Sequence, residues 1–287
     1  MSTQERLHET CRRLLEEGTV QVVIGYAHTA PGEPAFPVFI SDPADVGQLV
    51  WNRCCLANLT KYLLRQEIRA LGKPAIFVKG CDERALVVLQ RESQIDPAQM
   101  LSIGVACRGE ESPRHAACAA CDVRRPRFCD IMIDEVPDDP PPVAASSAAA
   151  RYADLEIFLT KTPAERVAYW TEELSRCVKC YACRQACPLC YCQRCIADKN
   201  RPTSIDTSAT LKGNFAWHIT RAFHLAGRCV GCDQCTRACP AGIDLRLLNL
   251  SLARAAEENF AFRAGTDSAA EPILGSYSQQ DQELFIQ

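Results

Sequence analysis

Cysteine is the residue type whose spacing in this chain points most directly to chemistry. Two runs share the spacing Cys-x2-Cys-x2-Cys-x3-Cys-Pro, one ending at Cys187-Pro188 and the other at Cys239-Pro240. This spacing is typical of loops that bind cubane [4Fe–4S] clusters, where three thiolates bind one cluster and the fourth binds the neighbouring cluster. Thiolates suit soft iron, and proline ends the segment because it lacks an N–H donor. The runs therefore predict two clusters with exchanged fourth ligands.

The ligand exchange defines two candidate sites. Site 1 comprises Cys177, Cys180, Cys183 and Cys239, and site 2 comprises Cys229, Cys232, Cys235 and Cys187. The alternative for both is zinc, which also binds four thiolates from Cys-x2-Cys pairs. Much of the chain between the two runs has helical character, which favours a helical ferredoxin domain over the small β-hairpin type.

Three more cysteines, Cys190, Cys192 and Cys195, follow the first run within a few residues. One interpretation is an additional cluster completed by a distant cysteine such as Cys54 or Cys55. The other is that they are buried thiols beside the cluster pocket that tune its potential. The spacing alone supports both interpretations.

A further set of cysteines follows two predicted strands, 75–78 and 100–106. One cysteine comes directly after each strand, and a Cys-x2-Cys pair follows a short loop later. Because the carboxyl ends of parallel strands meet at one edge of a sheet, where α/β folds place ligands, these thiols converge. We therefore predict a third [4Fe–4S] cluster, with zinc or unligated thiols as alternatives and Cys129 as a substitute ligand. Site 3 comprises Cys81, Cys107, Cys118 and Cys121.

The turn between the predicted strand 75–78 and the helix after it is a candidate anion site. Lys79, Gly80 and Asp82 lie in this turn, and the N-terminus of a helix can bind phosphate. An ordinary tight turn is the alternative. The chain has neither a Gly-rich dinucleotide fingerprint nor a P-loop.

The elements that must position these residues follow from hydrophobic periodicity. An amphipathic helix is predicted over 1–20, a buried strand over 21–27 and helical spacing over 50–69. A strand, a helix over 82–91 and a second strand then form a βαβ unit, which implies a parallel sheet. The second half is mainly helical, with helices starting at Pro163, covering 215–226 and starting after Asp244. The fold class is therefore an α/β domain followed by a mainly α-helical dicluster ferredoxin domain.

A Pro-, Ala- and Ser-rich segment divides the chain near its midpoint. The predicted division is an α/β domain over 1–136, a linker over 137–150, a helical domain with two [4Fe–4S] clusters over 151–265, and a tail over 266–287.

Composition excludes several classes of protein. The 287 residues include 19 cysteines, and a net charge of −3 is the wrong sign for a nucleic-acid partner. There is no apolar run of about 18 residues to span a membrane and no apolar N-terminal segment like that of a signal peptide. We therefore expect a cytoplasmic protein, where thiols stay reduced and clustered cysteines bind metal.

The cysteine-bearing segments resemble a known family. Phe77-Val78-Lys79-Gly80-Cys81-Asp82, Ile103-Gly104-Val105-Ala106-Cys107 and Cys118-x2-Cys121 are similar to the core of the β subunits of deazaflavin-reducing hydrogenases and formate dehydrogenases. The second half, from Arg176-Cys177 to Arg228-Cys229, resembles the dicluster ferredoxin domain found beside heterodisulfide-reductase-like subunits in anaerobes. The resemblance implies iron–sulfur clusters, and FAD in some members, for which Lys79, Gly80 and Asp82 would be the phosphate site.

The resulting hypothesis is an electron-transfer subunit of a cytoplasmic multi-subunit redox complex. It would relay electrons between a catalytic dehydrogenase- or hydrogenase-type subunit and a flavin-containing, heterodisulfide-reductase-like partner. Such a relay needs no acid or base, and no catalytic residue is predicted. The alternatives are an FAD-containing oxidoreductase that itself reduces a small acceptor, and a zinc-stabilised interaction scaffold.

Overall fold

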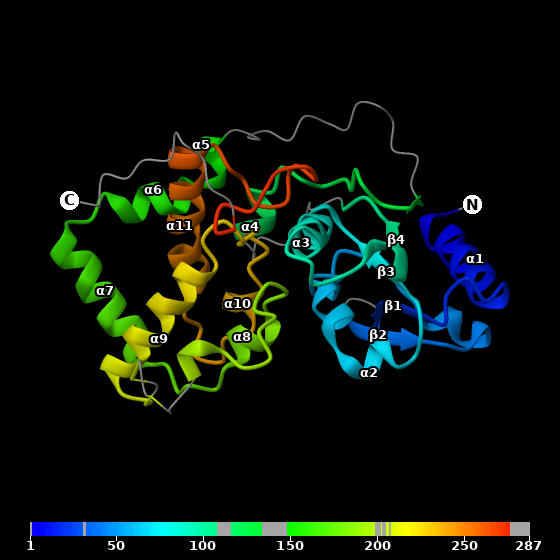
Figure 1. The fold of residues 1–287 in the computed structure, drawn as a ribbon, viewed down its shortest axis with the longest axis horizontal. Helices are drawn as coiled ribbons and strands as arrows, with labels where there is room; N and C mark the ends of the chain where they lie inside the picture. Colours follow the sequence, from blue (N-terminus) through cyan, green and yellow to red (C-terminus); the bar gives the residue numbers. More distant parts are fainter. Residues whose placement is uncertain are drawn as a thin grey trace.

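The computed structural model describes residues 2–30, 33–107, 116–133, 148–198, 202, 205–206 and 208–275. Figure 1 shows two halves side by side: an α/β half, formed by the described residues up to 133, and a helical half, formed by residues 148–260. No helix in these ranges combines the length and the apolar character needed to cross a membrane.

The α/β half is built on one mixed sheet of five strands in the order β2-β1-β3-β4-β5. β2 pairs with β1 in antiparallel orientation, and the other three pairs are parallel. The predicted α/β class with parallel strands is therefore confirmed. The strands are β1 (Val22–Ala27), β2 (Phe36–Ile40), β3 (Pro74–Val78), β4 (Leu101–Gly104) and β5 (Ile131–Met132).

Strand β2 was not predicted, because its neighbourhood contains several prolines. The structure places Pro37 opposite Tyr26 on an edge strand. Proline is tolerated there because the missing N–H can face away from the ladder.

The helical spacing over 50–69 does not produce the helix that we predicted. Residues 50–58 are irregular, and the 3-10 helix η2 (Leu59–Leu64) and the short helix α2 (Gln66–Arg69) follow. Two asparagine side chains accept hydrogen bonds from the backbone two residues ahead, Asn52 from Cys54 (2.8 Å) and Asn58 from Thr60 (3.1 Å). Such turns compete with helix formation, which explains the difference.

Helices lie on both sides of the sheet region. α1 (Thr3–Glu16) begins at a capping box formed by Ser2 and Glu5, and buries Cys11 as a packing residue. α3 (Gly80–Arg91) follows β3 directly, as the βαβ pattern predicted. The remaining short elements are η1 (Pro43–Gln48), η3 (Pro97–Gln99) and α4 (Ala116–Ala119).

The helical half contains the three predicted helices. They are α7 (Pro163–Ser175), α9 (Leu211–His224) and α11 (Leu245–Phe260), and Asp244 caps α11 as expected. Figure 1 shows the short helices α8 and α10, which belong to the two cysteine runs, between α9 and the α/β half. The other elements are α5 (Ala148–Arg151), α6 (Ala153–Leu159), α8 (Ala182–Ala186), η4 (Ile196–Asp198) and α10 (Gln234–Arg237).

Helix α3 joins the two halves because both of its faces are buried. Leu86 belongs to the core of the α/β half, whereas Ala85 and Leu89 pack with Leu189 and Val230 of the helical half. A helix that is buried on both faces fixes the halves relative to each other.

The segment after α11 runs back across the molecule to α3 (Figure 1). Arg84 donates hydrogen bonds to the carbonyl oxygen of Ala264, and Arg91 forms an ion pair with Glu271. The described part of the predicted tail therefore lies against the α/β half. Residues 137–147 of the predicted linker and 276–287 of the tail lie outside the described residues, and α5 begins at Ala148.

Candidate iron–sulfur sites

The four cysteines of site 1 surround one small cavity. Trp217 and His218 of α9 form part of its wall, and Leu245 at the start of α11 closes it. Three of the thiols come from the first run and one from the second, which is the arrangement that the spacing predicted. The four are Cys177, Cys180, Cys183 and Cys239.

The two cysteine runs use the same backbone geometry to present their thiols. The second and fourth residues after the first cysteine have positive φ in both runs: Lys179 (57°) and Tyr181 (59°), then Gly231 (70°) and Asp233 (61°). Left-handed conformation is uncommon for residues other than glycine, so its repetition at matched positions marks a shared loop. In the first run, this loop directs three thiols to the cavity of site 1.

The cysteines of site 2 are also brought together. Burial raises the pKa of the Cys232 thiol well above its usual value, and the neighbouring thiols Cys187, Cys229 and Cys235 act in the same direction. Cys187, Cys229 and Cys232 pack against the apolar side chains through which α3 contacts the helical half. Site 2 therefore lies at the junction of the two halves.

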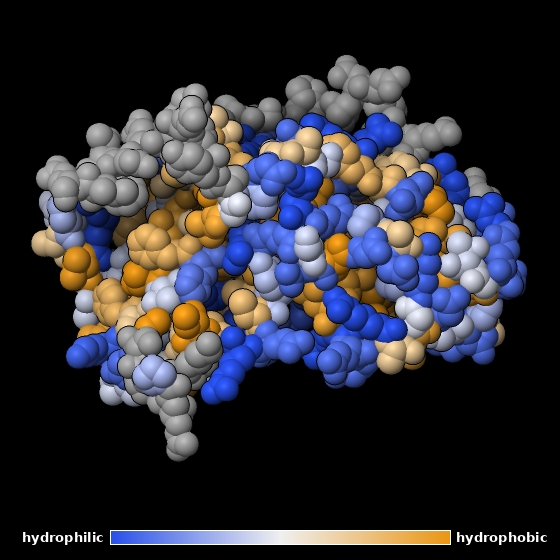
Figure 2. Space-filling view, viewed as in Figure 1, coloured by the Kyte–Doolittle hydropathy of each residue, from blue (hydrophilic) through white to orange (hydrophobic). Residues whose placement is uncertain are grey.

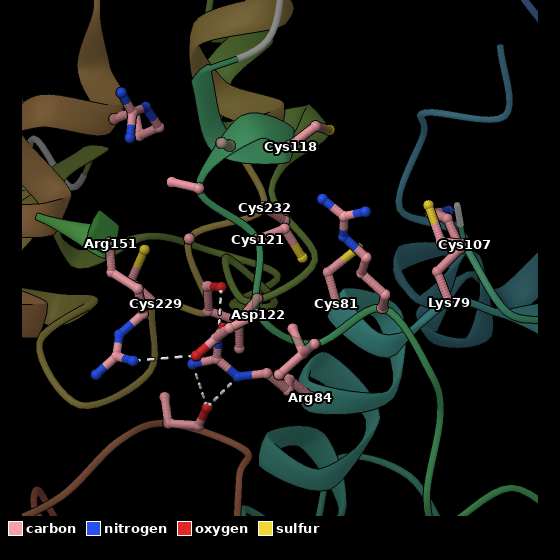
Figure 3. Close-up of a pocket in the computed structure, with 18 of the residues that line it drawn as sticks. Lys79, Cys81, Arg84, Cys107, Cys118, Cys121, Asp122, Arg151, Cys229 and Cys232 are labelled. Carbon is pink, nitrogen blue, oxygen red and sulfur yellow. Dashed lines mark hydrogen bonds and ion pairs between the residues drawn. The ribbon is translucent and has the colours of Figure 1, made fainter. Parts of the chain in front are cut away.

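All four cysteines of site 3 line a single cavity of about 480 Å³. Figure 3 shows these cysteines around the cavity, and Cys81 lies close enough to Cys121 for their charges to interact. The backbone N–H of Cys107 donates to the carbonyl oxygen of Arg124 (2.8 Å), which fixes the strand end beside the loop that carries Cys121. Cys129, the substitute ligand, does not line the cavity and instead contacts the sulfur of Met132 at 3.8 Å.

Sites 2 and 3 share this cavity, because Cys229 and Cys232 line it as well (Figure 3). Burial raises the pKa of the Cys81 thiol, and Asp82, Cys121 and Cys232 raise it further. Cys81 of site 3 therefore lies close enough to Cys232 of site 2 for their charges to interact. The sequence did not reveal this adjacency, since the two residues are far apart along the chain.

The cavity wall contains two arginines, one buried and one half-buried, whose hydrogen bonds go to carbonyl oxygens. Arg84 donates to Ala264 (2.9 and 2.7 Å) and Val230 (3.0 Å), and Arg237 donates to the carbonyl oxygens of Leu56 (2.9 Å) and Cys232 (3.0 Å). Within the described ranges, neither arginine forms an ion pair with a carboxylate. A cluster bound by four thiolates carries negative charge, which such cations would offset.

The wall also contains one balanced charge network. The Asp122 carboxylate accepts two hydrogen bonds from Arg263 (2.7 and 2.5 Å) and one from Arg151 (3.0 Å). Because Asp122 follows Cys121 directly, these ion pairs connect the site 3 loop to helix α5 and to the segment after α11. The halves are therefore linked at the cavity by ion pairs as well as by α3.

The thiols fit cubane clusters better than single ions. Among the described residues, no three His, Cys, Asp or Glu side chains lie close enough together to bind one metal ion. The thiols of sites 1 and 3 instead line cavities. The site 3 cavity of about 480 Å³ has room for a group with four irons, each bound by a different thiolate, whereas the site 1 cavity is only about 20 Å³.

The cysteines of the candidate additional cluster are not brought together. Cys55 lines the cavity of site 3, whereas Cys190 forms a hydrogen bond with Cys187 of site 2. Cys195 packs near Trp217 on the side of site 1, and Cys192 is exposed. The chain from 190 to 195 thus directs its thiols to different surroundings.

The turn at Lys79 does not fit a phosphate group. The Lys79 ammonium forms an ion pair with Asp82 (2.6 Å) and hydrogen bonds with Tyr26 and the carbonyl oxygen of Ala57. A side chain at Gly80 would collide with the carbonyl oxygen of Val123. The N-terminus of α3 is therefore occupied by the protein's own carboxylate and backbone, although Lys79 also lines the site 3 cavity.

Sequence reasoning missed three polar side chains that lie beside candidate ligand cysteines. His218 places its Nε2 atom 3.3 Å from Cys177 Sγ, and burial lowers its pKa to about 3. Asn249 donates to Cys235 Sγ at 3.5 Å. The third is Arg221, which lies between the two runs. The sequence could have identified these side chains by their positions on the inner faces of α9 and α11. That inference requires knowing which face of each helix lies against the thiols.

Comparison with known proteins agrees with this geometry. A family model described as a 4Fe–4S dicluster domain matches residues 173–243, which include both cysteine runs. The chain is also 30% identical over 106 residues to the β subunit of an F420-dependent formate dehydrogenase from Methanocaldococcus jannaschii, covering 37% of this chain and 27% of that protein.

A second relative aligns along nearly the whole chain. The β subunit of F420-dependent formate dehydrogenase 1 from Methanococcus maripaludis is 21% identical over 91% of this chain and 90% of its own length. These similarities confirm the predicted resemblance to iron–sulfur β subunits, at modest identity.

Proposed function

We propose that this protein is an iron–sulfur electron-transfer subunit of a formate dehydrogenase-type complex, with three [4Fe–4S] clusters held in the order site 1, site 2, site 3. The observation that carries the proposal is the shared cavity wall, where Cys229 and Cys232 of site 2 meet the thiols of site 3. Sites 1 and 2 are also neighbours, because Cys239 of the second run lines the cavity of site 1. Each site thus adjoins the next without a break.

The clusters would supply one-electron transfer, and the chain's own residues would hold and insulate them. The matched left-handed turns orient the thiols, and α3 fixes the distance between the helical half and the α/β half. Buried arginines offset negative charge around the cavity, and apolar side chains such as Trp217 and Val230 exclude water. These features set reduction potentials rather than bind a reacting substrate.

The two ends of the row would meet different partner subunits. At site 1 the Cys180 residue is exposed and Val178 is 67% exposed, so a redox partner can approach closely. Figure 2 shows apolar side chains gathered on the helical half, where Ile157, Val167 and Phe223 are exposed on α6, α7 and α9. We assign a dehydrogenase-type subunit and a flavin-containing, heterodisulfide-reductase-like subunit to the two ends, in a cytoplasmic complex.

Counting iron, acid-labile sulfide and flavin in the anaerobically purified chain tests this proposal. Three cubane clusters predict about 12 irons and about 12 sulfides per chain. A content near 8 irons would contradict the cluster at site 3. Zinc without sulfide would contradict the electron relay and favour a zinc-stabilised scaffold. Bound flavin with turnover by the chain alone would favour an oxidoreductase instead.

A further inference from the structure

Arg221 of α9 lies between the two cysteine runs. It is 6% exposed, and its Nη2 atom donates to the carbonyl oxygen of Cys183 at 3.2 Å. It also forms a hydrogen bond with Cys190, the cysteine that contacts Cys187. Its guanidinium therefore touches the loop of site 1 and the surroundings of site 2.

The charge of Arg221 has no carboxylate to balance it. Among the residues that the structure describes, no Asp or Glu forms an ion pair with it, and its Nε atom has no hydrogen-bond partner. Burying an unpaired cation costs several kcal/mol, so such a residue needs a compensating negative charge. The groups that face it are thiols, because Cys190, Cys187, Cys235 and Cys183 all lie close enough to interact with its charge.

The facing thiols belong to both sites. Cys183 is a residue of site 1, whereas Cys187 and Cys235 are residues of site 2. On the cluster assignment proposed above, Arg221 is thus a cation common to two clusters. We propose that Arg221 is a positioning residue whose single buried charge sets the reduction potentials of sites 1 and 2 together.

The physical basis is the charge that each site gains on reduction. A buried cation stabilises the more negative, reduced state, and the low local dielectric keeps this interaction strong. Because one guanidinium faces both ligand sets, it raises both potentials in the same direction. A change in this one charge therefore shifts both potentials in the same direction.

Three variants of the full chain separate charge from shape. Arg221→Gln removes the cation, and Arg221→Lys retains it without the planar guanidinium. Lys212→Gln is the matched control, because Lys212 lies on the same helix, loses the same charge and is exposed, where solvent and salt screen it. The measurement is a redox titration of each anaerobically purified variant, monitored by electron paramagnetic resonance, together with its iron content.

Arg221→Gln is expected to lower the equilibrium constant for reduction about tenfold at both sites, which is about 59 mV for a one-electron couple. Arg221→Lys should stay within about threefold of the wild type at both sites, and Lys212→Gln should not change either potential. If Arg221→Gln instead loses iron that Arg221→Lys retains, the charge is needed to assemble the sites, which also supports the proposal.

The proposal is overturned if Arg221→Gln moves only one potential or neither. It is also overturned if Arg221→Lys shifts the potentials, or loses iron, as much as Arg221→Gln does. A wild-type chain without [4Fe–4S] signals from the two runs would overturn the proposed function itself. Wild-type signals with unchanged variants would overturn the role of Arg221 alone.

Discussion

At the scale of single residues, the structure shows a hydrogen bond between a buried histidine and a candidate ligand thiol. A thiolate can only accept, so the Nε2 atom of His218 must carry the proton that it shares with Cys177. Its other ring nitrogen is buried and has no hydrogen-bond partner among the residues that the structure describes. The ring is thus held by a contact with the thiol that strengthens as negative charge increases.

Replacing His218 should lower the potential of site 1. A hydrogen bond to a charged acceptor contributes about 1.5–3 kcal/mol of stabilisation. The difference in this stabilisation between the oxidised and the reduced site corresponds to tens of millivolts in the midpoint potential. We expect His218→Phe to shift the midpoint potential downward by this amount in a redox titration. His224→Phe is the control, since His224 is exposed on the same helix. Equal potentials in the two variants would show that the contact has no such effect.

The exchange of ligands between the runs can be tested with one residue from each run. Cys239→Ala should abolish the signal of site 1 although Cys239 belongs to the second run, because it lines the cavity with Cys177. Cys187→Ala should affect site 2 instead. Electron paramagnetic resonance of each reduced variant distinguishes the sites. Loss of the second-run signal in Cys239→Ala would contradict the exchange.

Helix α3 is the element on which the arrangement of the sites depends. Its first turn carries Cys81, its N-terminus lies against the loop that carries Cys121, and its last turns pack on the helical half. Gly80 permits this because the backbone of Val123 occupies the space where a side chain would be.

Gly80→Ala is therefore expected to separate α3 from the site 3 loop. Overpacking of this kind destabilises by about 1–3 kcal/mol, and iron bound at site 3 should fall while sites 1 and 2 keep theirs. Urea unfolding and iron analysis provide the two measurements. Gly47→Ala is the control, because a side chain there meets nothing within 4 Å. Full iron content in Gly80→Ala would show that site 3 does not depend on the close approach of Gly80 to the backbone of Val123.

The contact between α3 and the helical half makes a separate prediction. Leu89 is fully buried between the halves, so Leu89→Ala should lower the free energy of unfolding by about 2–5 kcal/mol. Leu71→Ala, at a position 46% exposed, should change it by less than about 0.5 kcal/mol. Denaturant titration of both variants is the measurement, and similar stabilities would mean that the halves fold without this contact.

The sequence predicts elements where one local pattern dominates. Periodicity located β3, α3 and α11, and the cysteine spacing located the two runs that the dicluster model matches. It failed for β2, since an edge strand tolerates Pro37, and over 50–58, where asparagine side chains bond to the backbone. Both failures arise because one side chain or one neighbouring strand decides the local conformation.

At the scale of the whole molecule, the decisive feature was not predictable from spacing. Cys81 and Cys232 approach each other only because α3 and the segment after α11 bring the halves together. Likewise, Arg221 faces two ligand sets only because α9 lies between runs that are far apart in sequence. The motifs predict which cysteines bind clusters, and tertiary packing determines which candidate sites are neighbours.

The adjacency of sites 2 and 3 is the central claim, and magnetic interaction between them tests it most directly. In the fully reduced chain, electron paramagnetic resonance should show the site 2 signal broadened by site 3. The double variant Cys81→Ser and Cys121→Ser should lose about four irons and narrow that signal, while site 1 stays unchanged. Loss of the same iron with an unaltered site 2 signal would contradict a continuous row of clusters.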